Sequence, residues 1–383
     1  MKAKVAVCVA AGLAAALHAE PLMLQPAQRV YDGGAALNPG GQAIPCMADW
    51  NGDGLPDLLV GYQPAFKVAV YLNSGSPTEP RFAGFTQVQA GGADIYHWST
   101  GCGSPALWVC DYDGDGRRDL LVGAGADGRV WFYRNTNTDA NPVLTSGVTL
   151  HRSGGELNVG GRATPYVHDW DEDGLPDLLC GDANGLVHWF KNTGTRESPI
   201  YLNDVLIPAG GTELNLGYRS AIRVCDWDGD GVKDLVGSGA NNAAWCRNTG
   251  DNAAPVLSSP TRLQSPVSGA GLADIDTGYR MRLDMTDWSQ DGVPDLLIGS
   301  WDGYIHLYEG YRFRLTGWSL RAGNPCALEW NSAPFLKYQV LAGSTVNDLS
   351  RIVATNVTSG GKVTCWTNVL GGDRLFLRVQ LVQ

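Results

Sequence analysis

The sequence predicts an all-β protein, in which a five-bladed β-propeller closed by an N-terminal strand is followed by a small β-sandwich. Three observations favour this fold. Glycine is abundant, with 50 of 383 residues and no Gly-X-Y period, which suits many short strands joined by turns. A ten-residue acidic motif occurs five times, every 57 to 62 residues. Apolar stretches with the length and alternation of β-strands flank each copy.

The first 19 residues have the pattern of a secretory signal peptide. Lys2 and Lys4 precede an apolar run from Val5 to Leu17, and Ala19 is a small residue at the expected cleavage point. We therefore expect export, to the extracellular medium, the periplasm or the cell surface. After this segment, no apolar run is long enough to span a bilayer.

The composition limits the classes of partner and metal. Lys and Arg number 28 against 39 Asp and Glu, which gives a formal net charge of -11. An acidic chain without a basic stripe is a poor candidate for binding nucleic acid or an anionic membrane. The chain has no CxxC pair, so structural zinc is not expected. Most cysteines are expected to be small buried hydrophobes, and Cys326 with Cys365 is the one pair that merits a test for a disulfide.

The repeated motif places oxygen-bearing side chains at positions 1, 3, 5 and 9 of a tight loop. Its five copies are DWNGDGLPDL at 49–58, DYDGDGRRDL at 111–120, DWDEDGLPDL at 169–178, DWDGDGVKDL at 226–235 and DWSQDGVPDL at 287–296. Four such oxygens can converge on one cation, glycine at position 6 allows a sharp turn, and the carbonyl at position 7 can add another oxygen. This donor set favours calcium over magnesium, which gives up its waters reluctantly.

We therefore predict up to five calcium ions. Polar hairpin turns are the alternative, but five copies in one register argue against it. Asn51 and Ser289 replace a carboxylate at position 3, so the first and fifth loops are expected to bind more weakly. The predicted ligands are Asp49, Asn51, Asp53, Leu55 and Asp57; Asp111, Asp113, Asp115, Arg117 and Asp119; Asp169, Asp171, Asp173, Leu175 and Asp177; Asp226, Asp228, Asp230, Val232 and Asp234; and Asp287, Ser289, Asp291, Val293 and Asp295.

Each repeat is expected to form four antiparallel strands, one before the loop and three after it. The fourth strands of the first four repeats are predicted at 82–88, 143–150, 201–207 and 256–263. The fifth repeat stops after its third strand, near Tyr311, while residues 22–37 form an orphan stretch before the first repeat. The end of this stretch matches the segments that follow the other fourth strands. We therefore expect it to complete the fifth blade and close the ring.

Residues 313–383 differ from the repeats. The motif is absent, and six short alternating stretches predict a small β-sandwich. The expected organisation is a signal peptide at 1–19, a propeller at 22–312 and a C-terminal module at 313–383.

The five-fold motif resembles the FG-GAP/VCBS repeats of integrin-α-like calcium-binding β-propellers, over about residues 22–312. The C-terminal module is similar to fibronectin type III-like modules. The first resemblance implies a propeller with calcium in these loops and a ligand on the opposite face. The chain departs from the family where segments such as Gly160–Pro165 replace the Phe-Gly opening. Integrin heads also carry more than five blades, so the resemblance does not imply integrin-like adhesion.

The face opposite the calcium loops carries the predicted ligand site. Arg162, Arg219 and Arg280 occupy equivalent positions in successive crossings between blades. Around a central depression they can bind an anionic sugar or a peptide carboxylate. The alternative is that they pair with loop acids or cover apolar surface. The other candidate ligand-binding residues on this face are Asp182, Asn184, Trp301 and Asp302.

No catalytic motif is evident. The sequence lacks a Gly-x-Ser-x-Gly elbow, a phosphate loop, a dinucleotide fingerprint and a His-Glu-x-x-His pair. The favoured hypothesis is a secreted, calcium-stabilised propeller that acts as a non-catalytic carbohydrate- or protein-binding module. One alternative is a carbohydrate-active enzyme, a polysaccharide lyase or glycoside hydrolase, that uses the face opposite the calcium loops. Another is a purely structural surface protein.

Overall fold

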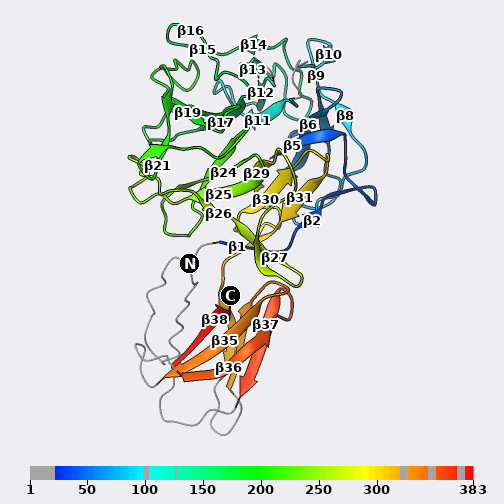
Figure 1. The fold of residues 1–383 in the computed structure, drawn as a ribbon. Coiled ribbons are helices and arrows are strands. Elements are labelled where there is room, and N and C mark those ends of the chain that lie inside the picture. The colour runs from blue at the N-terminus through cyan, green and yellow to red at the C-terminus, as the bar shows by residue number, and fades with distance from the viewer. Residues whose placement is uncertain are drawn as a thin grey trace.

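The computed structural model describes residues 22–97, 103–125, 127–319, 326–343, 351–368 and 376–382. These residues form strands and no helix, and hence no helix that could cross a membrane. The repeats form one unit and the C-terminal strands a second unit, which lies at one side of the first (Figure 1). The predicted signal peptide at 1–19 lies outside the described residues.

Each repeat forms one four-stranded antiparallel sheet, and the described residues contain five such sheets. We number sheets and acidic loops 1 to 5 in the chain order of the loops. The inner strands are β5 (Gly41–Ala48), β11 (Ala106–Cys110), β17 (Thr164–His168), β23 (Ala221–Cys225) and β29 (Arg282–Thr286). The second strands are β6 (Asp57–Gln63), β12 (Asp119–Gly123), β18 (Asp177–Gly181), β24 (Asp234–Gly239) and β30 (Asp295–Gly299). The third strands are β7 (Lys67–Tyr71), β13 (Val130–Tyr133), β19 (Val187–Phe190), β25 (Asn242–Cys246) and β31 (Ile305–Tyr308).

The outer strands are shorter than the sequence predicts. Each pairs with its sheet over only two residues, and the chain then turns into a separate two-stranded hairpin. Paired glycines with positive φ, such as Gly91 and Gly92 at 60° and 83°, make these turns. The outer strands are β8 (Thr86–Gln87), β14 (Val148–Thr149), β20 (Val205–Leu206), β26 (Thr261–Arg262) and β2 (Gln28–Arg29). The hairpins are β3 (Tyr31–Asp32) with β4 (Ala35–Ala36), β9 (Gln89–Ala90) with β10 (Ala93–Asp94), β15 (His151–Arg152) with β16 (Gly155–Glu156), β21 (Pro208–Ala209) with β22 (Thr212–Glu213), and β27 (Gln264–Val267) with β28 (Gly271–Asp274).

The N-terminal segment completes sheet 5, as predicted. β2 pairs with β31, with Arg29 opposite His306, and β1 (Met23–Leu24) pairs with β32 (Gly310–Tyr311). The inner strands contact one another in cyclic order, and β29 contacts β5. Val30 and Leu37 are buried between sheets 5 and 1 with Leu297. The five sheets therefore form a closed circuit, as the blades of a propeller do.

The aromatic residues at motif position 2 pack between neighbouring sheets. Trp50 lies in one apolar cluster with Leu107 of the next sheet, and Trp227 in another with Leu283. Trp227 is only 1% exposed. The repeated aromatic residue is therefore part of the contact that holds adjacent sheets together.

Five side chains meet at the centre of the ring. The Arg223 Nε donates to Asp284 Oδ1 at 2.6 Å, and the guanidinium lies 4.7 Å and 5.1 Å from the ring centroids of Trp108 and Tyr166. Burial and the neighbouring Asp284 raise the pKa of Cys46 to about 12. All five residues stand three positions before an acidic loop, one in each sheet. Because they come from all five sheets, they fill the axis of the propeller with a buried ion pair and aromatic rings.

Breaking this ion pair is expected to destabilise the fold. In Asp284→Ala, the buried Arg223 loses its carboxylate, and removing one partner of a buried pair costs about 3–5 kcal/mol. The double variant Arg223→Met with Asp284→Leu leaves no charge unpaired. Its free energy of unfolding should therefore be closer to that of the wild type. Urea unfolding measures both. A single variant as stable as the double variant would contradict this role for the pair.

The C-terminal strands form two three-stranded sheets around a shared core. One contains β33 (Leu315–Ser319), β34 (Cys326–Asn331) and β37 (Val363–Asn368), and the other β35 (Lys337–Gly343), β36 (Arg351–Thr358) and β38 (Phe376–Val382). Trp330 and Tyr338 pack between them with their rings 5.6 Å apart. This arrangement fits the predicted sandwich. Gln25 of the propeller donates to the Ser332 carbonyl at 3.0 Å, which ties the module to the N-terminal segment.

The candidate disulfide between Cys326 and Cys365 is not formed. Cys365 is a free thiol that donates to Glu329 Oε2 at 3.4 Å. The strand register puts Cys365 opposite Glu329 and Cys326 opposite Asn368. Three residues along a strand span about 10 Å, which is too far for a disulfide.

Candidate functional site

The acidic loops connect the inner strand of each sheet to its second strand, and all five share one turn geometry. The glycine at position 6 has φ between 80° and 90° in every loop, a conformation that costs glycine little. Its N–H donates to the position-1 carboxylate at 2.9–3.2 Å. The N–H of position 7 donates to the position-5 carboxylate at 2.8–3.0 Å. The repeated acids therefore hold the loop backbone as well as offering oxygens inside it.

The aspartate at position 9 joins the loop to the rest of its sheet. In each sheet it is 0% exposed. One carboxylate oxygen accepts the N–H of position 2, and the other accepts an N–H just after the third strand. In loop 1, Asp57 accepts the N–H of Trp50 at 2.9 Å and that of Asn73 at 2.7 Å. Burial raises the pKa of these carboxyls, to about 6 for Asp119, Asp177, Asp234 and Asp295. The Oδ1 atom of each of these aspartates accepts one hydrogen bond, which leaves a second lone pair that can face a cation.

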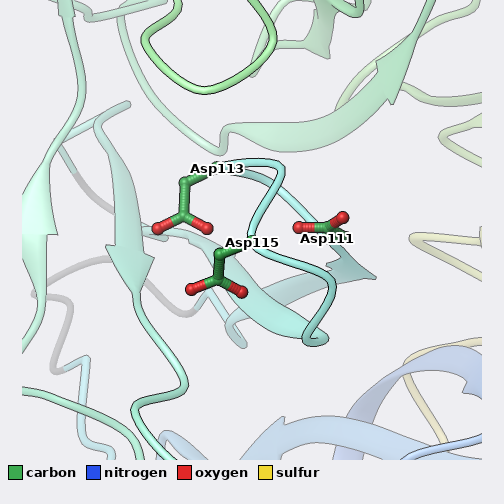
Figure 2. A group of neighbouring side chains, drawn as sticks. All are labelled: Asp111, Asp113 and Asp115. Atoms are coloured by element: carbon green, nitrogen blue, oxygen red, sulfur yellow. The ribbon is translucent and has the colours of Figure 1, made fainter.

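The carboxylates at positions 1, 3 and 5 converge in loops 2, 3 and 4. In each of these loops, one oxygen from each of the three aspartates lies within 4.8 Å of the others. Figure 2 shows the arrangement in loop 2, where Asp111, Asp113 and Asp115 surround the turn after β11. Loops 1 and 5 lack a carboxylate at position 3. In loop 1, the Asn51 side-chain amide donates to Asp53 Oδ2 at 2.9 Å instead.

Four oxygens in these loops fit a bound cation. The Oδ1 atoms of Asp111, Asp113, Asp169 and Asp171 are buried and accept no hydrogen bond from the described residues. A buried carboxylate oxygen without a donor is costly, and a hard cation would satisfy it. Two of these oxygens belong to loop 2 and two to loop 3, and carboxylate oxygens are ligands that calcium prefers.

The three arginines predicted to bind a ligand meet on the opposite face. Arg162, Arg219 and Arg280 line one cavity, together with Arg282 and Gln42. The free space between them is about 10 Å³, room for one water-sized guest at the mouth of the axis. Four of these residues stand seven positions before a loop and have φ between 51° and 65°. Gln42 could have been predicted to line the cavity because it also stands seven positions before a loop. Arg282 could have been predicted because it lies two residues after Arg280, on an inner strand.

The cavity is strongly electropositive. Arg282 is 4% exposed, and its Nε has no hydrogen-bond partner among the described residues. Burial, together with repulsion from Arg219, Arg162 and Arg280, lowers the pKa of Arg282 well below its usual value. Arg219 Nη1 donates to Gln42 Oε1 at 2.9 Å. Crowded cations of this kind favour an anion between them.

Exposed aromatic rings lie against Arg219 and Arg280, two of the arginines that line the cavity. Tyr218, Tyr279 and Trp301 are 40%, 51% and 48% exposed. The two tyrosines stack with centroids 6.4 Å apart and planes 15° apart. The Arg280 guanidinium lies 4.5 Å from the Trp301 ring and 5.0 Å from Tyr279. Arginine and aromatic side chains thus form one continuous surface at the mouth.

The remaining candidate ligand residues shape hairpins and do not line the cavity. Asp182 accepts the N–H groups of Asn184 and Leu186 at 2.9 Å and 2.7 Å, which closes the turn between β18 and β19. Asp302 accepts the Ser300 hydroxyl and the Tyr304 N–H in the turn between β30 and β31. Both carboxylates are therefore used by their own turns.

Comparisons with known proteins agree with this architecture. The FG-GAP-like repeat family matches residues 169–236, and the FG-GAP repeat family matches residues 106–133. Integrin alpha-4 of Xenopus laevis is 29% identical over 159 residues, which are 39% of this chain and 15% of that protein. The chain therefore spans only a small part of the length of this relative.

Two solved structures show a distant likeness. The Photorhabdus luminescens Tc holotoxin pore has a TM-score of 0.38 and 18% identity, covering 90% of this chain and 15% of that chain. A lectin of Agrocybe aegerita, studied for recognition of non-reducing terminal N-acetylglucosamine, has a TM-score of 0.37 and 15% identity, covering 88% and 87%. With TM-scores this low, neither structure indicates what this chain binds.

The matched segments lie within the sheets and loops described above. Residues 106–133 contain β11, loop 2 and β13, and residues 169–236 run from the start of loop 3 into the second strand of sheet 4. FG-GAP repeats indicate a β-propeller that serves as a binding module. The chain therefore contains FG-GAP repeats, and part of it resembles an integrin α subunit.

Proposed function

We propose that this protein is an exported, calcium-stabilised propeller that binds an anionic ligand at the mouth of its axis without catalysing a reaction. An acidic saccharide is the favoured ligand, and a carboxylate of an extracellular protein is the second candidate. The observation that carries the proposal is the meeting of Arg162, Arg219, Arg280 and Arg282 beside three exposed aromatic rings. The predicted signal peptide at 1–19 supports export.

The chemistry of this face favours a ligand that combines charge with a flat or ring-shaped body. Guanidinium groups bind carboxylates and sulfates through paired, charge-assisted hydrogen bonds. The cavity itself is too small for a sugar ring and has room for one water-sized group, so only an oxygen of a charged group can enter it. The exposed rings of Tyr218, Tyr279 and Trp301 offer apolar faces next to it, where the body of the ligand can lie.

Calcium is proposed for the five loops as a structural ion. Aspartates at positions 1, 3, 5 and 9 would hold it, with Asn51 or Ser289 at position 3 in loops 1 and 5. When bound, it supplies the positive charge that the converging carboxylates need. The buried and unpartnered oxygens of Asp111 and Asp169 support this assignment.

The composition of the cavity favours binding over catalysis. Glycoside cleavage needs two carboxyl groups on either side of the scissile bond. The residues that line the cavity include several arginines, Gln42, Ser104 and Thr164 but no carboxylate. The enzyme hypothesis has no comparable support on this face. If the protein fails to bind any ligand, a purely structural role is favoured.

Replacing the three arginines tests the proposed site. The triple variant Arg162→Gln, Arg219→Gln and Arg280→Gln is expected to weaken binding of an acidic glycan at least tenfold, because each charge-assisted hydrogen bond contributes about 1.5–3 kcal/mol. Glutamine fits this backbone, since Gln42 has φ 51° at the equivalent position of the first repeat. The melting temperature should change little. A glycan array followed by calorimetry provides the measurement.

A matched control separates a local effect from a loss of net charge. Arg81→Gln, Arg262→Gln and Arg351→Gln remove three exposed arginines that do not line the cavity. This control should bind as the wild type does. Equal binding by the two triple variants, or collapse of the cavity variant, would place the ligand site elsewhere.

A further inference from the structure

One position at the end of the third strand differs between the loops. It lies just before the residue whose N–H bonds to the position-9 aspartate. In sheets 2, 3 and 4 it carries Arg134, Lys191 and Arg247. Each of these cations bonds to the carboxylates at positions 3 and 5 of its own loop. Arg134 lies 2.7 Å from Asp113 and 2.9 Å from Asp115.

The same contact is repeated in the next two sheets. Lys191 bonds to Asp171 and lies 2.8 Å from Asp173. Arg247 lies 2.7 Å from Asp228 and 2.8 Å from Asp230. The position-3 carboxylates are only 14%, 13% and 5% exposed. Each contact therefore joins a mostly buried carboxylate to a cation that is 33–48% exposed, whereas both partners of an ordinary surface ion pair are exposed and contribute little.

Loops 1 and 5 have neither the cation nor the extra acid. The equivalent residues are Leu72 and Glu309, and position 3 holds Asn51 and Ser289. Glu309 pairs instead with Lys362 of the C-terminal module. The position-3 carboxylate and the cation are thus present together in three sheets and absent together in two. Other arginines contact position 1 from a neighbouring sheet, such as Arg118 on Asp49 at 3.1 Å, and do not follow this pattern.

The cations offset the charge that the extra carboxylate brings. Counted over positions 1, 3, 5 and 9 alone, four aspartates and this cation have the same formal charge as the three aspartates of loop 1 or loop 5. In loop 2, Arg117 also bonds to Asp115. The cations also occupy particular oxygens. They bond to Oδ2 of positions 3 and 5. In loops 2 and 3, Oδ1 of positions 1 and 3 stays buried without a hydrogen bond.

We propose that Arg134, Lys191 and Arg247 are tethered counter-ions of the acidic loops. Each keeps its loop together when calcium is absent, and each lowers the affinity of its loop for calcium. This inference rests on the calcium part of the proposed function. It also removes the reason to expect loop 5 to be a weak site, because its lower carboxylate count is matched by the absence of this cation. The reason is lessened for loop 1, where Arg118 still contacts Asp49.

The test is the full-length triple variant Arg134→Leu, Lys191→Leu and Arg247→Leu. Leucine is the natural residue at this position in sheet 1, where Leu72 is 45% exposed. Without the cations, three loops should bind calcium at a free concentration about tenfold lower, since a unit charge a few ångströms away opposes a divalent ion. In excess chelator the variant should melt below the wild type. Calorimetric titration with calcium chloride and thermal melts give the two readouts.

The control variant removes three paired surface cations away from the loops: Lys67→Leu, Arg129→Leu and Arg262→Leu. It has the same change in net charge and should keep the calcium affinity of the wild type. Calcium uptake with equal half-saturation in both triple variants would overturn the inference while leaving the calcium proposal intact. No calcium uptake by any of the three proteins would overturn both.

Discussion

Removing calcium with excess chelator is expected to lower the melting temperature of this protein by on the order of 10 °C or more. A site filled at about one hundred times its dissociation constant adds roughly 2.7 kcal/mol to the native state, and five loops can add their contributions. Without the ion, the carboxylates at positions 1, 3 and 5 repel one another at the junction of two strands. Differential scanning calorimetry with and without EDTA measures the shift.

Controls assign this shift to calcium in the loops. Adding back calcium should restore the melt, whereas the same concentration of magnesium should restore little of it, because magnesium resists losing its waters. Asp173→Ala should reduce the calcium-dependent part of the melting temperature, and Glu213→Ala, an exposed acid on a hairpin, should not. A melt that excess chelator leaves unchanged would exclude structural calcium.

Deleting residues 22–37 is expected to abolish the monomeric fold. The deletion removes β1 and β2 and exposes β31 as an unpaired edge. It also removes Leu24, Val30 and Leu37, which are buried in clusters beside sheet 5. Each fully buried side chain of this size contributes roughly 1.5–3 kcal/mol, so the loss is a large share of the stability of a domain. Size-exclusion chromatography should show aggregates, since open strand edges pair with other chains.

A peptide supplied in trans provides the control for this deletion. The peptide of residues 22–37 should restore a monomeric, cooperatively melting protein when it is present during refolding, because it returns the missing pairing and the missing core residues. A scrambled peptide of the same composition should not. A truncated protein that stays monomeric with the wild-type melting temperature would rule out the closing role of this segment.

The repeats could be predicted from the sequence because their signals are local. The five loops carry their turn glycines and their acids within nine residues, and the orphan N-terminal segment is recognisable from the same Gly-rich ending as the other fourth strands. The short outer strands could not be predicted in the same way. The strand predicted at 82–88 pairs with its sheet only at Thr86–Gln87, and the left-handed Gly91 and Gly92 then turn the chain into a hairpin.

The candidate sites were harder to predict where residues from several sheets meet. Arg223 contacts Trp108, Tyr166 and Asp284 from three other sheets, and no local pattern reveals such a contact. Asp182 lies on the predicted face, but its carboxylate is used by its own hairpin. The pairing of Lys191 with Asp171 joins positions 20 residues apart in sequence. Residue type predicted the chemistry of these groups, whereas their partners depended on the packing of the ring.

The closing strand also determines the order in which the chain can complete its fold. Gln25 bonds to a residue 307 positions later, so a segment that is synthesised before all five repeats is among the last to find its partners. Sheets 1 to 4 can form from neighbouring residues, whereas sheet 5 waits for the two ends of the propeller to meet, and such long-range closure is slow. During this interval, β2 of one chain can pair with β31 of another. Two chains that exchange these strands would each complete the fifth sheet of the other, so the concentration during refolding decides between closed monomers and linked pairs.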